Sequence, residues 1–195
     1  MATETDICNL ALLRAAKDTI ASTSDGSRAA ELCAILLPIC RDAMLREFPW
    51  NFARKRVGLA LLDEEAPTNW GYAYALPTDC IQVLSLTVPG LRVPTGNYRV
   101  PYEVSGGKLY TDIATPELIY TARVEYSMWD GLAVSALAWL LCSELATPLS
   151  LKPDQAQSAR QAYMQIKAAA AAQSMNEGWE AEPLGDWLSA RDYCG

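Results

Sequence analysis

The hydrophobic and polar positions of this chain follow a helical period at both ends and a strand period in between. Apolar residues recur every three or four positions over residues 4–15 and 27–48, and this spacing predicts two amphipathic helices. The second helix contains Pro38, which should kink it by removing a backbone hydrogen bond, and it should end at Pro49. The chain therefore begins with a helical pair.

Between residues 50 and 124 the apolar period changes to two, and proline and glycine separate the alternating segments. Short strands at this density favour a small antiparallel sheet or a sandwich. The turn 105–108 should join two of the strands, and the alternation breaks near residue 84. The predicted strand segments are 52–62, 70–77, 80–88, the two that flank the turn, and 117–126.

Helical spacing returns at Asp130 and continues almost to the end of the chain. The segment 130–148 is apolar nearly all round, so the helix that it predicts should be covered on several sides. A last helix is predicted over 153–177. It contains the alanine run 168–172, which favours helix and permits a second backbone to approach closely.

The final segment, 178–195, is too short to build a core, yet it carries several large apolar side chains. Terminal segments of this kind fray unless something holds them, and aromatic anchors dominate protein contacts when they find pockets. We predict that this C-terminal arm grips a partner. Folding back on its own subunit and docking on a neighbouring subunit are the alternatives. The anchors are Trp179, Leu184, Trp187, Leu188 and Tyr193.

Together these segments predict an α+β protein with a helical bundle body, an inserted β region and an extended arm. The two helical pairs should pack together across the insertion, because no amphipathic helix can bury its own apolar stripe. Trp50 and Phe52 should be buried where the body meets the sheet. The predicted division is 1–50 and 126–177 for the two halves of the body, 51–125 for the β insertion and 178–195 for the arm.

The charge of the chain argues against one class of partner. Its formal net charge is −7, whereas a protein that grips double-stranded DNA usually presents a basic surface. The basic cluster from Arg54 to Arg56 is therefore interpreted as the solvent-facing side of a strand.

Composition also limits the chemistry. The chain has no histidine, which removes most serine, cysteine and histidine-base mechanisms, and its six cysteines include no closely spaced pair that would indicate zinc. We expect no cofactor and no metal. Cys33 and Cys40 should be small buried residues on one helix face. The longest apolar run, 131–143, is shorter than the roughly 20 residues that a membrane span needs, so we expect no span.

Four stretches, taken in order, resemble the head-to-tail adaptor proteins of tailed bacteriophages, the tail tubular protein A type of short-tailed phages and their prophage relatives. The match covers roughly residues 5–176, and the arm lies outside it. The stretches are "LPICRDAMLREFPWNFARKRVGLA", "WGYAYALPTDCIQVLSL", "YEVSGGKLYTD" with "LIYTARVEYSMWD" behind it, and "ALAWLLCSELATPLS" followed by the alanine-rich helix.

The resemblance implies a structural virion protein at the head–tail junction, synthesised in the host cytoplasm. Such proteins form a ring, typically of twelve subunits, under the portal. The ring extends the DNA channel, through which the genome passes without specific binding, and it supports the next tail component, a nozzle or tail tube, with tail fibres as further partners. Subunit contacts are expected in the helical body, at Leu132, Leu137, Trp139, Ala169 and Ala170.

Two other classes of function stay open from the residues. A virion-associated glycan hydrolase would need two carboxylates facing each other in a groove; Asp79 and Glu103 are candidates that nothing in the sequence pairs. The acidic run 63–65 is more simply a solvated hairpin turn. The second alternative is a cytosolic regulatory or chaperone-like module. Oligomer size separates these alternatives from a ring-forming protein.

Overall fold

The computed structural model describes residues 2–64, 66–67, 69–89 and 100–177. Within these residues the chain forms four α-helices and two three-stranded sheets, so it is an α+β protein, as predicted. The described residues divide into two compact units. We call them the helical unit, formed by 2–55, 79–82 and 120–177, and the β unit, formed by the described part of 56–78 and 83–119.

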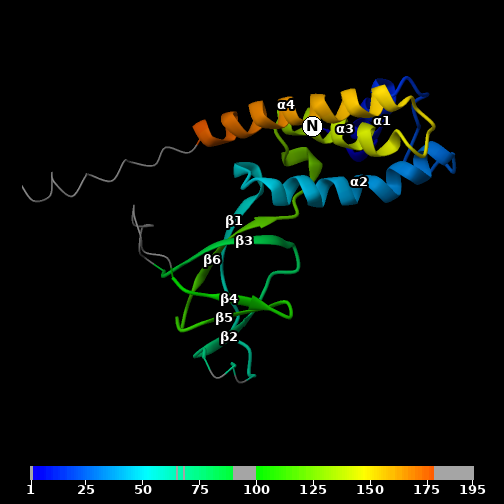
Figure 1. Cartoon of the computed structure of the whole chain (residues 1–195). Helices are drawn as coiled ribbons and strands as arrows, with labels where there is room; N and C mark the ends of the chain where they lie inside the picture. The colour runs from blue at the N-terminus through cyan, green and yellow to red at the C-terminus, as the bar shows by residue number, and fades with distance from the viewer. Residues whose placement is uncertain (1, 65, 68, 90–99, 178–195) are drawn as a thin grey trace, which may run out of the picture. The chain divides into compact units, whose positions relative to one another are not determined.

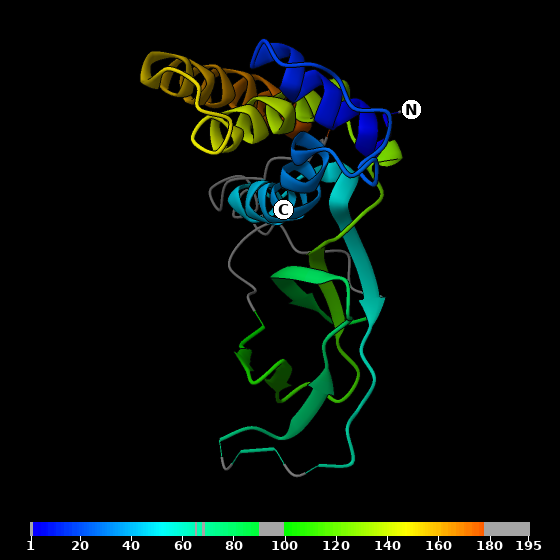
Figure 2. The same ribbon diagram turned by 90° about the vertical axis from the view of Figure 1, so that its right-hand side faces the viewer.

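The helical unit is organised around α3, which contacts the three other helices. Figure 1 shows α3 and α4 side by side and running in opposite directions, and Figure 2 shows α3 between α1 and α4. Thr3, Ser27 and Asp130 cap their helices by accepting a backbone N–H of the first turn. The helices are α1 (Glu4–Arg14), α2 (Arg28–Glu47), α3 (Gly131–Leu145) and α4 (Pro153–Asn176).

The core of the helical unit is centred on α3, whose sequence is apolar around nearly its whole circumference. The prediction that several elements cover this helix is confirmed, because other helices of the unit pack against it and most of its residues are buried. In contrast, α2 has one buried face: Leu37 and Met44 are inaccessible, whereas Ile35 and Ile39 are 63% and 61% exposed. The buried residues of α3 are Ala133, Ala136, Leu137, Ala138, Leu140, Leu141, Cys142 and Leu145.

The cysteines of the helical unit behave as small core residues. Cys33 and Cys40 are buried on α2, as predicted, and Cys8 and Cys142 are buried on α1 and α3. Burial raises the pKa of Cys40 to about 12, because the thiolate would lose its hydration. The Cys40 thiol therefore stays protonated and contributes packing rather than reactivity.

Six short strands form two sheets. The first has the order β1-β6-β3 and the second the order β2-β5-β4, with both pairings of the second sheet antiparallel. The predicted break near residue 84 does not interrupt β3, which is continuous. The strands are β1 (Arg54–Gly58), β2 (Tyr72–Ala75), β3 (Cys80–Thr87), β4 (Glu103–Ser105), β5 (Lys108–Thr111) and β6 (Glu117–Ala122).

The predicted turn between β4 and β5 is present. Gly106 and Gly107 have φ values of 58° and 76°, in the left-handed region that glycine enters without a steric penalty. Two such residues in succession are typical of the two-residue hairpin turn, whose twist matches that of the flanking strands. Ser105 consequently pairs directly with Lys108.

The β unit has a small core around Tyr74. Its side chain is 1% exposed, and its hydroxyl donates toward the carbonyl oxygens of Ile113 and Ala114, at 2.8 and 2.7 Å. Leu109, on β5, and Leu118, on β6, are also fully buried. A single aromatic side chain thus links β2 to the segment that leads into β6.

The basic cluster of β1 faces solvent, as the sequence predicted. All five residues of β1 are exposed, so the strand lacks the buried alternate positions that its apolar residues suggested. Within the helical unit, Lys55 pairs with Asp79 at 2.7 Å; within the β unit, Arg56 lies 3.7 Å from Glu117. These exposed ion pairs contribute little to stability.

Candidate functional site

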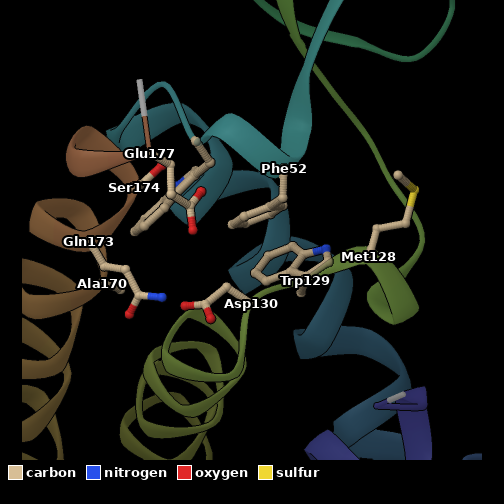
Figure 3. Close-up of a pocket in the computed structure, with 9 residues that line it drawn as sticks. Phe52, Met128, Trp129, Asp130, Ala170, Gln173, Ser174 and Glu177 are labelled. Carbon is tan, nitrogen blue, oxygen red and sulfur yellow. The ribbon is translucent and has the colours of Figure 1, made fainter. Parts of the chain in front are cut away.

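A pocket of about 210 Å³ lies in the helical unit, where three segments distant in sequence meet (Figure 3). The segments are the turn that follows α2, the turn that precedes α3, and the last turns of α4. The lining residues are Trp50, Phe52, Met128, Trp129, Asp130, Ala170, Gln173, Ser174 and Glu177.

The wall of the pocket is part of a continuous series of aromatic contacts. Phe48 meets Trp50 edge-on at a centroid distance of 4.9 Å, and Trp50 stacks on Phe52 at 5.7 Å. Phe52 contacts Trp129 at 5.0 Å, and Trp129 contacts Tyr126 at 5.9 Å. Aromatic pairs at these distances stabilise beyond the area that they bury, so the series fixes the two turns against each other.

Hydrogen bonds hold the turn after α2 in place. The indole Nε1 of Trp50, whose side chain is 1% exposed, donates to the carbonyl oxygen of Met44 at 2.9 Å. The backbone N–H of Asn51 donates to Ser174 Oγ at 3.1 Å, and the Asn51 amide donates to the Ser174 carbonyl. This turn is therefore tied both to α2 and to the end of α4.

Polar groups face the opening between the aromatic walls. Figure 3 shows the carboxylates of Asp130 and Glu177 and the amide of Gln173 directed toward the centre of the pocket. Asp130 is also the N-cap of α3, since its Oδ2 accepts from the N–H of Leu132 at 3.1 Å. The site thus combines stacked aromatic rings with two acidic groups.

The indole N–H of Trp129 has a different setting. The Trp129 side chain is 7% exposed, and its Nε1 has no hydrogen-bond partner among the described residues. In Figure 3 this nitrogen lies on the side of the ring nearer Met128, away from the two carboxylates. An unpaired buried donor is costly, so this position is a weak point of the packing.

The two residues predicted at the end of the first helical pair both belong to the pocket. Trp50 is buried, as expected, whereas Phe52 is only half-buried because one side of its ring faces the opening. Sequence reasoning did not select Trp129 or Asp130. The signal that would have found them is the motif "YSMWD" at 126–130, aromatic residues directly before a helix cap.

The structure separates the five residues predicted at subunit contacts into two groups. Leu137 is fully buried and Ala170 is 2% exposed, so both side chains pack inside their own subunit. Leu132 is 38% exposed, Trp139 is half-buried and Ala169 is exposed. Only the second group offers surface to another molecule.

Trp139 lies under a guanidinium group at the edge of a second pocket of about 260 Å³. The Cζ atom of Arg14 stands 4.3 Å from the ring centroid, and its two terminal nitrogens donate to the carbonyl and the hydroxyl of Ser135, both at 2.8 Å. Burial lowers the pKa of Arg14 from its ordinary value. The cation is thus held against the indole by contacts between α1 and α3.

The five predicted anchors of the arm lie outside the described residues, and the docking prediction stays a prediction. They are Trp179, Leu184, Trp187, Leu188 and Tyr193.

The carboxylates proposed for a hydrolase are engaged in structural contacts. Asp79 is partly desolvated, which opposes its ionisation, but hydrogen bonds from Lys55 and Tyr120 outweigh this and lower its pKa. A general acid needs the opposite shift. The environment of Asp79 is therefore not that of a general acid. Glu103 accepts from the indole of Trp70 at 2.8 Å.

Across the described ranges, no group of three or more histidine, cysteine, aspartate or glutamate side chains is arranged to hold a metal ion. Among the helices of the described chain, none combines the length and the apolarity required to cross a bilayer.

No protein-family model matches the chain, and no curated protein sequence matches it.

Proposed function

We propose that this chain is a structural head-to-tail adaptor of a tailed bacteriophage, a subunit of a twelve-membered ring under the portal. The observation that carries the proposal is the order of its elements. Helices from both ends of the described chain pack in one compact unit, and the β unit is built from the segments between them. This is the helical body with a β insertion that the residue pattern predicts, and the family that the sequence resembles implies a structural role.

The charge of the chain supports a conduit rather than a grip on DNA. A net charge of −7 leaves no excess of cations to bind phosphate, and the basic residues of β1 include Lys55 and Arg56, which face acidic partners. The genome would then slide through the channel without specific binding. Binding of the isolated protein to DNA should be weak and should vanish near physiological salt.

Of the five residues predicted at subunit contacts, two are buried within their own subunit, Leu137 and Ala170. We assign contacts between neighbouring subunits to the other three, which are Leu132, Trp139 and Ala169. Ala169→Trp adds bulk on an exposed face of α4, so it should block ring formation without unfolding the subunit. A variant that forms rings like the unmodified chain would remove this face from the interface.

The C-terminal arm is assigned to the portal. Several anchors are needed together, because ordering a flexible segment costs free energy that a single side chain cannot offset. Docking of the arm on a neighbouring subunit, or on its own, is the competing outcome. The next tail component, a nozzle or tail tube with tail fibres as further partners, would bind the free side of the ring.

The experiment is electron microscopy of the full chain mixed with the portal protein of the same genome. The proposal predicts rings seated on portals, and it predicts that deletion of residues 179–195 leaves a folded protein that no longer joins them. Truncated protein that still assembles on portals would overturn the arm assignment. Truncated protein that precipitates would favour the arm folding back on its own subunit.

A further inference from the structure

The aromatic pocket of the helical unit combines features that recognise one kind of chemical group. Its walls are the rings of Trp50, Phe52 and Trp129, and two carboxylates, Asp130 and Glu177, point into it from different helices (Figure 3). These residues come from three segments distant in sequence, so the combination is a product of the fold. It is also independent of the adaptor function proposed above.

The volume sets the size of the occupant. At about 210 Å³ the pocket is smaller than the roughly 300–1,000 Å³ typical of sites for cofactors and drug-sized ligands. It is of the right order for one long side chain. A cofactor or a drug-sized ligand is therefore too large, whereas one side chain presented by another macromolecule fits.

The acidic lining of the pocket indicates the charge of the group that it binds. The two carboxylates repel anions and favour a cation. No metal-binding cluster exists among the residues that the structure describes. Aromatic faces, in contrast, attract organic cations through their quadrupole.

The shape of the walls distinguishes the two cationic side chains. Trp50 stacks on Phe52 with an interplanar angle of 27°, and Phe52 meets Trp129 at 37°, so these rings pack on one another. Trp50 and Trp129 are 1% and 7% exposed, so the half-buried Phe52 ring is the aromatic surface that the pocket offers. A planar guanidinium stacks on such a ring and binds carboxylates in a fork, whereas the compact lysine ammonium does neither. We infer that this pocket binds an arginine side chain of a partner protein, packed against the Phe52 ring and paired with Asp130 and Glu177.

The matched probes are N-acetyl-arginine amide and N-acetyl-citrulline amide, which have the same shape but differ in charge. The full chain carries five methionines, and labelled methionine methyl groups remain visible by NMR in large assemblies. Met128, at the pocket and 60% exposed, is the reporter, assigned by Met128→Leu. Met164, 51% exposed on α4 and not part of the pocket, is the internal control.

The inference predicts that the arginine probe shifts the Met128 methyl signal in a saturable way and leaves Met164 unchanged. Citrulline, which lacks the charge, should bind at least about tenfold more weakly, and the lysine analogue should fall between them. Equal binding of arginine and citrulline, equal shifts of the two methionines, or no shift at all would each overturn the inference.

Two substitutions test the carboxylates without disturbing the fold. Asp130→Asn keeps a good helix cap while removing the charge, and Glu177→Gln changes an exposed residue beyond the last turn of α4. Each should weaken arginine binding by about fivefold or more. Glu31→Gln removes one exposed carboxylate elsewhere in the helical unit and should leave binding unchanged. Wild-type affinity in both pocket variants would contradict the proposed pairing.

Discussion

The helical unit and the β unit of this protein are stabilised in different ways. Of the 35 buried hydrophobic residues in the described chain, 30 belong to the helical unit and five to the β unit, although the β unit is somewhat less than half as large. The helical unit therefore draws most of its stability from burial of apolar surface. The β unit has less to bury and depends more on individual hydrogen bonds and on its glycine turn.

This difference has a consequence for how each unit tolerates change. A truncation in the helical unit leaves a cavity among residues that several helices share, so its effect should spread through the unit. A lost hydrogen bond in the β unit should remain local.

Trp50→Ala should have the largest effect on the helical unit. It removes a side chain that is 1% exposed, two aromatic contacts and the hydrogen bond to Met44, and should lower the free energy of unfolding by about 4 kcal/mol. Leu13→Ala, at a position 61% exposed, is the control and should cost less than about 0.5 kcal/mol. Denaturant unfolding measures both, and equal effects would refute the core described for this unit.

Leu137→Ala and Leu132→Ala compare the inside and the outside of α3. Leu137 is fully buried, so its truncation should cost about 3 kcal/mol; Leu132 is 38% exposed, and its truncation should cost less than about 1 kcal/mol. Denaturant unfolding of both variants provides the measurement. A larger loss at Leu132 would mean that its side chain packs more extensively than the structure indicates.

Tyr74→Phe tests the β unit through a single oxygen atom. The substitution removes the hydroxyl that bonds to the carbonyl oxygens of Ile113 and Ala114 and should cost about 1 to 2 kcal/mol. Amide hydrogen exchange should accelerate in β2 and β5 while the amides of α3 keep their protection. Uniform acceleration across the whole chain would contradict the separation into two units.

Glu47→Gln should have the smallest effect, and that effect should depend on pH. Partial burial opposes ionisation of Glu47, but hydrogen bonds from Lys167 and from Tyr163, at 2.6 Å, prevail and hold its pKa below the ordinary 4.5. Because the pKa is lower in the folded state, the ionised group stabilises the fold above about pH 4.5, and this is lost as pH falls through the folded-state pKa.

The Glu47 side chain is 35% exposed, so solvent screening keeps the expected cost near 1 kcal/mol or less at pH 7. Thermal unfolding of both proteins at pH 7 and pH 3 provides the measurement. The difference between them should shrink at the lower pH. A difference that grows on acidification would reverse the assigned sign.

The sequence predicts the elements of this fold well because their signals are local. The helices follow from apolar spacing, and the turn at Gly106 and Gly107 follows from residues that tolerate positive φ. The helical period also indicates which alanine of the run 168–172 is buried. Ala170 lies seven positions after the buried Tyr163, two turns along the same face, whereas Ala169 lies off that face.

The aromatic pocket could not be predicted in the same way. Phe52 and Trp129 touch at a centroid distance of 5.0 Å although most of the chain's β region separates them in sequence. No local pattern encodes which two turns meet. The packing of α2 and α4 on α3 decides it, and that is a tertiary property.

The central claim, that the chain is a ring-forming structural protein, is tested most directly by its mass in solution. Native mass measurement is made over a range of protein concentrations, alone and with the portal protein of the same genome. The account predicts a closed oligomer near 256 kDa for twelve chains of 21.3 kDa, alone or on the portal. A chain that stays at 21.3 kDa under every one of these conditions would contradict it.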